Sequence, residues 1–158
     1  MSLGKYLWSE TEDGVYSHIP AGTEAHFDKM DVTVESNYPW DGRVTYHITG
    51  KTEEETILGI HIPSWVRPGS VQVRINGKVK DITADVEKGY LILKRVWEND
   101  EVELVFPMKI RKIYANLKVR EDAGCVAFMR GPMVYCFEGV DNPGLLQSYH
   151  IFEDAKME

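Results

Sequence analysis

The sequence predicts an all-β fold, an antiparallel β-sandwich of about ten strands. Polar and apolar residues alternate with a period of two along most of the chain, as they do in strands with one buried face. Turn-forming pairs such as Asp41-Gly42 and Asn76-Gly77 recur at close to the spacing of strands and turns in a sandwich. No window of a dozen residues carries the 3.6-residue period of a helix.

The predicted strands follow one another along the chain, each about six to eight residues long. MDVTVESNYP at 30–39 places Met30, Val32 and Val34 on one face, and RVTYHITG at 43–50 repeats the alternation. The further predicted strands are TILGIHIP (56–63), VQVRING (71–77), GYLILKRVW (89–97), EVELVFP (101–107), GCVAFMRG (124–131) and PMVYCFEG (132–139).

Two local patterns refine this fold. Asn76-Gly77 is the clearest hairpin signal, because both central residues of a tight type I′ turn need a positive φ angle. GCVAFM at 124–129 and PMVYCF at 132–137 are apolar on both faces, which is typical of strands buried between a sheet and a further layer. We therefore expect two packed antiparallel sheets, with part of a second sandwich at one end as an open alternative.

Composition and charge exclude several classes of function. With 158 residues, 43% of them hydrophobic, we expect one well-buried domain or two small ones. A net charge of −7 argues against a nucleic-acid partner, because neutralising phosphates requires a positive surface. Apolar stretches are short and interrupted, so we expect no membrane partner. Two cysteines and no N-terminal signal pattern indicate a cytoplasmic location, with export of a full-length protein left open.

Cys136 and Glu138 resemble a catalytic pair, since alternate residues of a strand share one face and lie about 7 Å apart. A carboxylate, however, repels a thiolate instead of activating it. No histidine occurs within a dozen residues to complete a cysteine–histidine dyad. We interpret Cys136 as a buried residue near the end of a strand, where Glu138 reaches solvent, and assign no catalytic residue.

The remaining polar residues indicate no metal or cofactor site. The five histidines are scattered singly and form no H-x-H or H-E-x-x-H pattern. Glu53, Glu54 and Glu55 are adjacent, but a glycosidase needs two acids that face one concave site, and no such pair emerges from the sequence. We therefore expect neither a metal ion nor a cofactor bound by this chain.

Trp40, Trp65 and Trp97 are the candidate carbohydrate-binding residues. Each falls at or near the end of a predicted strand, where an exposed indole can stack on the apolar face of a sugar. The alternative is that these tryptophans close the ends of the sandwich core, as IPSWV around Trp65 suggests, and we favour it.

Six segments also carry a family resemblance, and they cover nearly the whole chain. In order they are LGKYLWSETEDGVYSHIPAGTEA, NYPWDGRVTYHI, LGIHIPSWV, VRINGK, GYLILKRVWENDEVELVFPMKIRKIYAN and VREDAGCVAFMRGPMVYCFEGVDN. Together they resemble glycoside hydrolase family 127, the beta-L-arabinofuranosidases and their relatives, long described as a domain of unknown function. Each segment alone is weakly diagnostic, whereas the ordered set is specific.

The resemblance implies that residues 1–158 are the C-terminal β-sandwich region of a longer glycoside hydrolase-like protein, with an internal boundary near 107–124. In that family an (α/α)6 barrel performs catalysis, and β-sandwich domains follow it. A zinc ion held by one glutamate and three cysteines activates a cysteine nucleophile in the barrel, and another glutamate is the general acid/base. Adjacent cysteines followed by Pro-Pro-Asn precede the part matched by LGKYLWS, so this chain would be truncated, and zinc would belong to the missing barrel.

We therefore expect a non-catalytic accessory region that supports the catalytic barrel of its parent enzyme. The two apolar-faced strands lead to the hypothesis that this region packs against the barrel, or that the isolated chain forms a homodimer. A rival from another class is a carbohydrate-binding module in which Trp40, Trp65 and Trp97 stack on arabinose-containing glycans.

Overall fold

The chain forms two compact units in the computed structural model, which describes residues 4–152 and 154–156. The first unit ends at Pro107 and the second begins at Met108. Strands are the main regular elements, and the described helices are short: α1 (Gly4–Leu7), η1 (Pro68–Ser70), η2 (Arg120–Asp122) and η3 (Leu146–Ser148). Within the described residues, no helix is long and apolar enough to cross a membrane.

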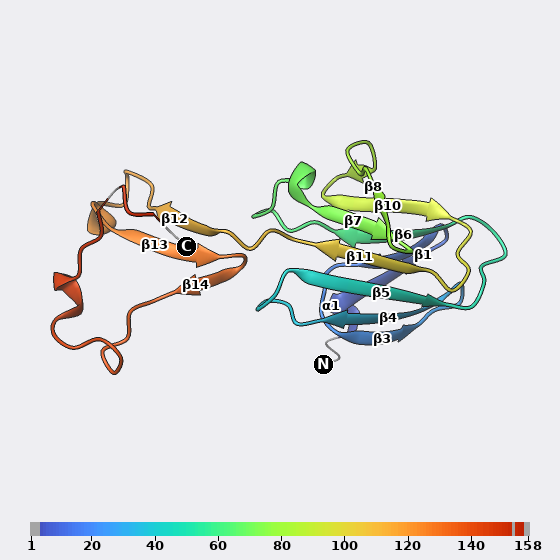
Figure 1. Cartoon of the computed structure of the whole chain (residues 1–158), viewed down its shortest axis with the longest axis horizontal. Helices are drawn as coiled ribbons and strands as arrows, with labels where there is room; N and C mark the ends of the chain where they lie inside the picture. Colours follow the sequence, from blue (N-terminus) through green and yellow to red (C-terminus); the bar gives the residue numbers. More distant parts are fainter. Residues whose placement is uncertain (1–3, 153, 157–158) are drawn as a thin grey trace. The chain divides into compact units, whose positions relative to one another are not determined.

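The first unit is a sandwich of two sheets (Figure 1). The five-stranded sheet has the order β1 (Trp8–Thr11), β2 (Gly14–Ser17), β6 (Thr56–His61), β10 (Tyr90–Arg95) and β9 (Val86–Glu87). The six-stranded sheet has the order β3 (Thr23–His26), β4 (Asp31–Ser36), β5 (Arg43–Thr49), β11 (Glu101–Val105), β7 (Gln72–Ile75) and β8 (Lys78–Lys80). The predicted all-β sandwich is confirmed.

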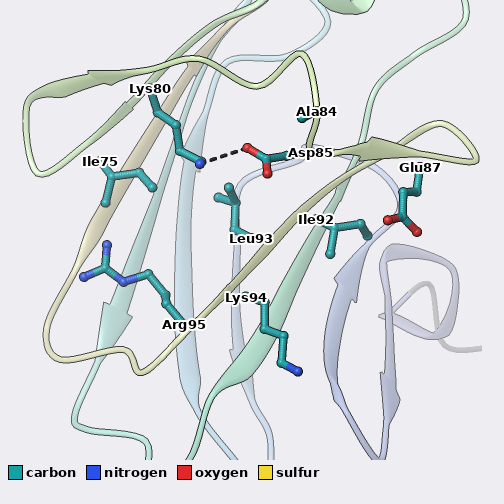
Figure 2. A pocket seen from close by; sticks show the side chains of 9 residues that line it. All are labelled: Ile75, Lys80, Ala84, Asp85, Glu87, Ile92, Leu93, Lys94 and Arg95. Atoms are coloured by element: carbon teal, nitrogen blue, oxygen red, sulfur yellow. Dashed lines mark ion pairs between the residues drawn. The ribbon is translucent and has the colours of Figure 1, made fainter.

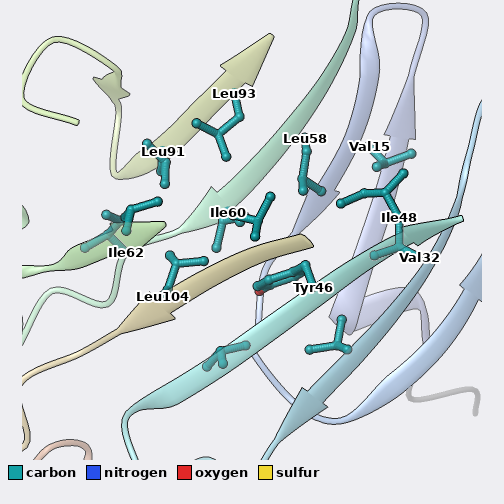
Figure 3. Packing of buried hydrophobic residues seen from close by; sticks show 14 of the residues in the cluster. Val15, Val32, Tyr46, Ile48, Leu58, Ile60, Ile62, Leu91, Leu93 and Leu104 are labelled. Carbon is teal, nitrogen blue, oxygen red and sulfur yellow. The ribbon is translucent and has the colours of Figure 1, made fainter. Parts of the chain in front are cut away.

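The core lies between these two sheets. Leu58 and Leu91 face it from the five-stranded sheet, and Val32, Tyr46 and Leu104 face it from the six-stranded sheet (Figure 3). All five side chains are almost completely inaccessible to solvent. Burying apolar side chains of this size stabilises a fold by about 1.5–3 kcal/mol each, so this layer is the main source of stability for the unit.

The sequence patterns predicted the core-facing residues of the early strands correctly. Met30, Val32 and Val34 all have exposed fractions of 5% or less, while Asp31 on the same segment is exposed. A hydrogen bond of 3.0 Å between the hydroxyls of Ser17 and Tyr46 joins the two sheets. Burial of Tyr46 raises the pKa of its phenol well above its usual value, so the group remains a neutral hydroxyl in the core.

The hairpin predicted at Asn76-Gly77 is confirmed. Asn76 has φ = 50° and Gly77 has φ = 74°, and Ile75 pairs with Lys78 across the turn. These positive angles at both central positions are those that a type I′ turn requires.

One pairing departs from the predicted antiparallel sheets. β2 lies parallel to β6, with Tyr16 opposite Gly59, whereas the other strand pairs are antiparallel. Parallel pairing needs a long crossover between the strands. Here β3, β4 and β5 form that crossover, and they belong to the other sheet.

The second unit contains one described sheet of three antiparallel strands, β12 (Ile110–Tyr114), β13 (Val126–Arg130) and β14 (Met133–Tyr135). Phe137 stacks on Tyr149, with ring centroids 5.4 Å apart and planes at 12°. The strands at 124–129 and 132–137 were predicted to be buried between a sheet and a further layer, and no such layer is among the described elements of this unit. Val134 and Tyr135 are accordingly 65% and 51% exposed.

Candidate functional site

Trp97 is a core residue. Its side chain is completely buried, and its indole Nε1 donates a hydrogen bond of 2.8 Å to the Thr56 carbonyl oxygen. The Arg95 guanidinium lies 5.4 Å from the centre of its ring, within cation–π range. No face of this indole is accessible to a sugar, which agrees with the interpretation that we favoured from the sequence.

Trp40 and Trp65 lie in loops that follow strands of different sheets. Trp40 is 65% exposed in the turn after β4, so its ring can be reached by a ligand. Trp65 is half-buried and packs edge-on against Phe106, with centroids 6.2 Å apart. Because Trp97 is inaccessible, the three predicted tryptophans do not form one stacking platform.

Both cysteines, Cys125 and Cys136, are exposed and free of any disulfide. Cys136 follows the last residue of β14, and its Sγ lies 3.8 Å from Glu138 Oε1. The predicted burial of Cys136 is wrong, because strand pairing stops at Tyr135 and the backbone then leaves the sheet. A thiol that donates weakly to a carboxylate is not an activated nucleophile.

The histidines separate into distinct environments. His26 lies 2.9 Å from an Asp31 carboxylate oxygen, and His47 lies 3.7 Å from a carboxylate oxygen of Glu101, both on the six-stranded sheet. Within residues 4–152 and 154–156, no three His, Cys, Asp or Glu side chains are close enough together to hold a metal ion.

A cluster that the sequence analysis missed surrounds Tyr90 on the five-stranded sheet. The rings of Tyr16, His18 and His61 lie 5.8, 5.8 and 5.2 Å from the Tyr90 ring, measured between centroids. His18 Nδ1 is hydrogen-bonded to the Tyr90 hydroxyl at 2.7 Å, and its Nε2 to the Ser9 hydroxyl at 2.9 Å. We call Ser9, Tyr16, His18, His61 and Tyr90 the aromatic face.

Strand pairing brings these side chains together on the outer side of the sheet. Tyr90 pairs with His61 in the antiparallel register, and Tyr16 lies opposite Gly59 in the parallel register. A Cβ atom at Gly59 would lie 2.2 Å from Tyr16 Cδ1, so only glycine lets the Tyr16 ring lie over this strand. A glycine inside a predicted strand is the sequence signal that could have revealed this close approach.

A separate open cavity of about 490 Å³ lies at one edge of the sandwich (Figure 2). Its walls combine Ile75 and Leu93 with the ion pair Lys80–Asp85, whose charged atoms are 2.8 Å apart. Arg95 also lines the cavity, and its guanidinium lies 3.5 Å from Asp100. Two of the cations around this cavity are therefore already paired with acids, which leaves little net charge to select a ligand.

Two protein-family models together match nearly the whole chain. Residues 14–108 match a family model described as the beta-L-arabinofuranosidase, GH127 middle domain. Residues 110–158 match the model of the glycoside hydrolase family 127 C-terminal domain. The two matches meet near the point where the structure divides into its two units.

Longer relatives share this region. A non-reducing end beta-L-arabinofuranosidase from Bifidobacterium longum subsp. longum is 38% identical over 157 residues, which are 95% of this chain and 23% of that protein. The crystal structure of a GH127 beta-L-arabinofuranosidase from Geobacillus stearothermophilus T6 has a TM-score of 0.87 at 40% identity, over 99% of this chain and 25% of that one. A GH127 beta-arabinofuranosidase structure has a TM-score of 0.78 at 35% identity, over 90% and 25%. The chain thus spans about a quarter of the length of these relatives.

Proposed function

The chain belongs to glycoside hydrolase family 127, and we propose that it is a non-catalytic accessory region of a larger beta-L-arabinofuranosidase-like enzyme. One observation carries the proposal: the two matched family models describe a middle and a C-terminal domain, while the matched relatives are about four times longer than the region they share. The catalytic domain then corresponds to the part of those relatives that this chain does not match.

The side chains of the described residues support the same proposal. The resemblance implies a zinc ion held by three cysteines and a glutamate, whereas this chain has two cysteines, and both lie exposed in the second unit. The described residues therefore do not fit the zinc site, and we assign no step of glycoside hydrolysis to them. Their role is to support the catalytic domain, and residues of this chain alone form the core of the first unit.

Hydrolysis of an aryl beta-L-arabinofuranoside tests this proposal. We expect turnover by the full-length protein, and none above background by the 158-residue chain supplied with zinc and a thiol reductant. Deleting this region from the full-length protein should lower the melting temperature of the remaining catalytic domain. Turnover by the chain alone, or a catalytic domain whose stability does not respond to the deletion, would contradict the proposal.

A carbohydrate-binding role is the alternative, and the exposure of Trp40 is the observation that favours it. Titration of the chain with arabinose-containing oligosaccharides, followed by tryptophan fluorescence, should then give a saturable change that Trp40→Ala abolishes. We expect no saturable change.

A further inference from the structure

The two outer faces of the sandwich differ sharply in chemistry. On the six-stranded sheet, Glu103 forms ion pairs with Arg43 and Arg74, and the latter pair is 2.9 Å apart. His47 and Glu101 add further polar groups to the same face. Charged side chains are seldom fully buried. This face is therefore suited to contact with water.

The outer face of the five-stranded sheet has fewer charges at its centre, and Lys94 opposite Ile57 and Glu87 opposite Tyr90 are the charged residues nearest to it. Its middle strand β6, TILGIH, contains no Asp, Glu, Lys or Arg, and Ile57 and His61 point outward while Leu58 and Ile60 point into the core. The adjacent strand β2 runs parallel to it. Strands with apolar residues on both faces and parallel pairing are characteristic of sheets covered on both sides. The sequence and the pairing thus both indicate that something covers this sheet.

The hydrogen bonds of the aromatic face favour a protein surface over a sugar as the covering group. Both ring nitrogens of His18 are already hydrogen-bonded, one to Tyr90 and the other to Ser9. A sugar-binding face needs polar groups that are open to the sugar hydroxyls, whereas the ring nitrogens of His18 are engaged by Tyr90 and Ser9. The network instead fixes the rings in place, which lowers the entropy that packing against another protein surface would cost.

We propose that the aromatic face, together with Ile57 and Ile92, is the surface on which this region docks against the catalytic domain of its own polypeptide. This inference rests on the proposed function. The occupant follows from length: about three quarters of each matched relative lies outside the shared region, and it is the nearest source of a protein surface large enough to cover this face. The partner surface is expected to place apolar and aromatic side chains against this face, because the strand β6 that it covers contributes no charged residue.

Hydroxyl-radical footprinting tests the docking face directly, because it labels tyrosine and histidine side chains in proportion to their exposure. We compare the 158-residue chain with the full-length protein. Labelling of Tyr16, His61 and Tyr90 should fall at least threefold in the full-length protein. His26 and His47 are internal controls on the opposite sheet, with side chains 79% and 36% exposed, and their labelling should not change.

Several outcomes would overturn the inference. Unchanged labelling of the aromatic face would show that no domain covers it, and protection of His26 and His47 would place the catalytic domain on the opposite sheet. Protection that rises with the concentration of the isolated chain would identify a second copy as the occupant. None of these results affects the hydrolysis test above, so failure of the docking face and failure of the accessory role can be distinguished.

A matched pair of variants provides a second test. Ile57→Glu places a carboxylate opposite Lys94, and Thr45→Lys places an ammonium opposite Glu103, each on the outward side of a middle strand. In the isolated chain both should shift the melting temperature by less than about 3 °C, since each new charge is exposed and next to an opposite one. In the full-length protein only Ile57→Glu should accelerate tryptic release of this region, by at least tenfold. Equal rates for the two variants would refute the docking face.

Discussion

Replacing Trp97 with phenylalanine tests whether this tryptophan is a core residue or a ligand-binding residue. The indole is completely buried, and its Nε1 donates to the Thr56 carbonyl oxygen at 2.8 Å. Phenylalanine lacks this donor, so a buried carbonyl loses its partner at a cost of about 1–3 kcal/mol. The smaller ring leaves a cavity that costs about 1 kcal/mol more. The free energy of unfolding should therefore fall by about 3 kcal/mol.

The matched control is Trp40→Phe. Trp40 is 65% exposed, and substitutions at exposed positions usually change the free energy of unfolding by less than about 0.5 kcal/mol. For a domain of about 100 residues, each kcal/mol corresponds to roughly 4–8 °C in melting temperature. Trp97→Phe should thus lower the melting temperature by about 15 °C, and Trp40→Phe by less than about 4 °C.

Thermal unfolding followed by far-ultraviolet circular dichroism measures both values on the 158-residue chain. A loss of less than about 4 °C in Trp97→Phe would refute the reasoning, because it would mean that neither the hydrogen bond nor the burial of the indole contributes to folding. An equal loss in the two variants would refute it as well, since burial is the property that distinguishes them.

Three further substitutions test other parts of the fold. Gly59→Ala should lower the free energy of unfolding in urea by about 1–3 kcal/mol, because the new Cβ would lie 2.2 Å from Tyr16 Cδ1. In a chain that already carries Tyr16→Ala, the same substitution should not have this effect. Gly77→Ala should cost about 1 kcal/mol through backbone strain alone, since φ is +74° and no atom lies within 4 Å of the new Cβ. Tyr46→Phe should cost about 1–3 kcal/mol by leaving Ser17 unpaired. Burial raises the pKa of the Tyr46 phenol in the folded chain, so above about pH 10 the phenol ionises in the unfolded chain first. The free energy of unfolding therefore falls as the pH rises above this value. Tyr46→Phe removes this phenol and should make the fall shallower.

The strands with one core face were predictable from the sequence because burial there is decided locally. Val32 and Val34 alternate with Asp31 and Thr33. A shift of the strand's pairing register by one residue would turn both valines toward solvent. The turn at Asn76-Gly77 was predictable for a similar reason, since few residues other than Asn and Gly tolerate its φ angles.

The cluster around Tyr90 could not be predicted in this way, because it depends on pairing between distant strands. His18 and Tyr90 are 72 positions apart and share a hydrogen bond only because β6 lies between β2 and β10 in the sheet. The parallel register of β2 against β6 places Tyr16 over Gly59. Periodicity identifies which side of a strand is polar, but it contains no information about which strand lies alongside it.

Consecutive apolar residues in a strand indicate that both of its faces are covered. We applied this criterion to PMVYCF (132–137), but TILGIH (56–61) meets it too. In TILGIH, Leu58 and Ile60 meet the sandwich core, while Ile57 and the aromatic face remain only half-buried. In PMVYCF, Val134 and Tyr135 are 65% and 51% exposed, although Phe137 stacks on Tyr149. The apolar excess in both strands therefore points to surfaces outside the described chain. For TILGIH, the absence of charges from the strand, its parallel neighbour β2 and the two hydrogen bonds of His18 favour a protein domain as the covering surface. The footprinting of Tyr16, His61 and Tyr90 would identify it.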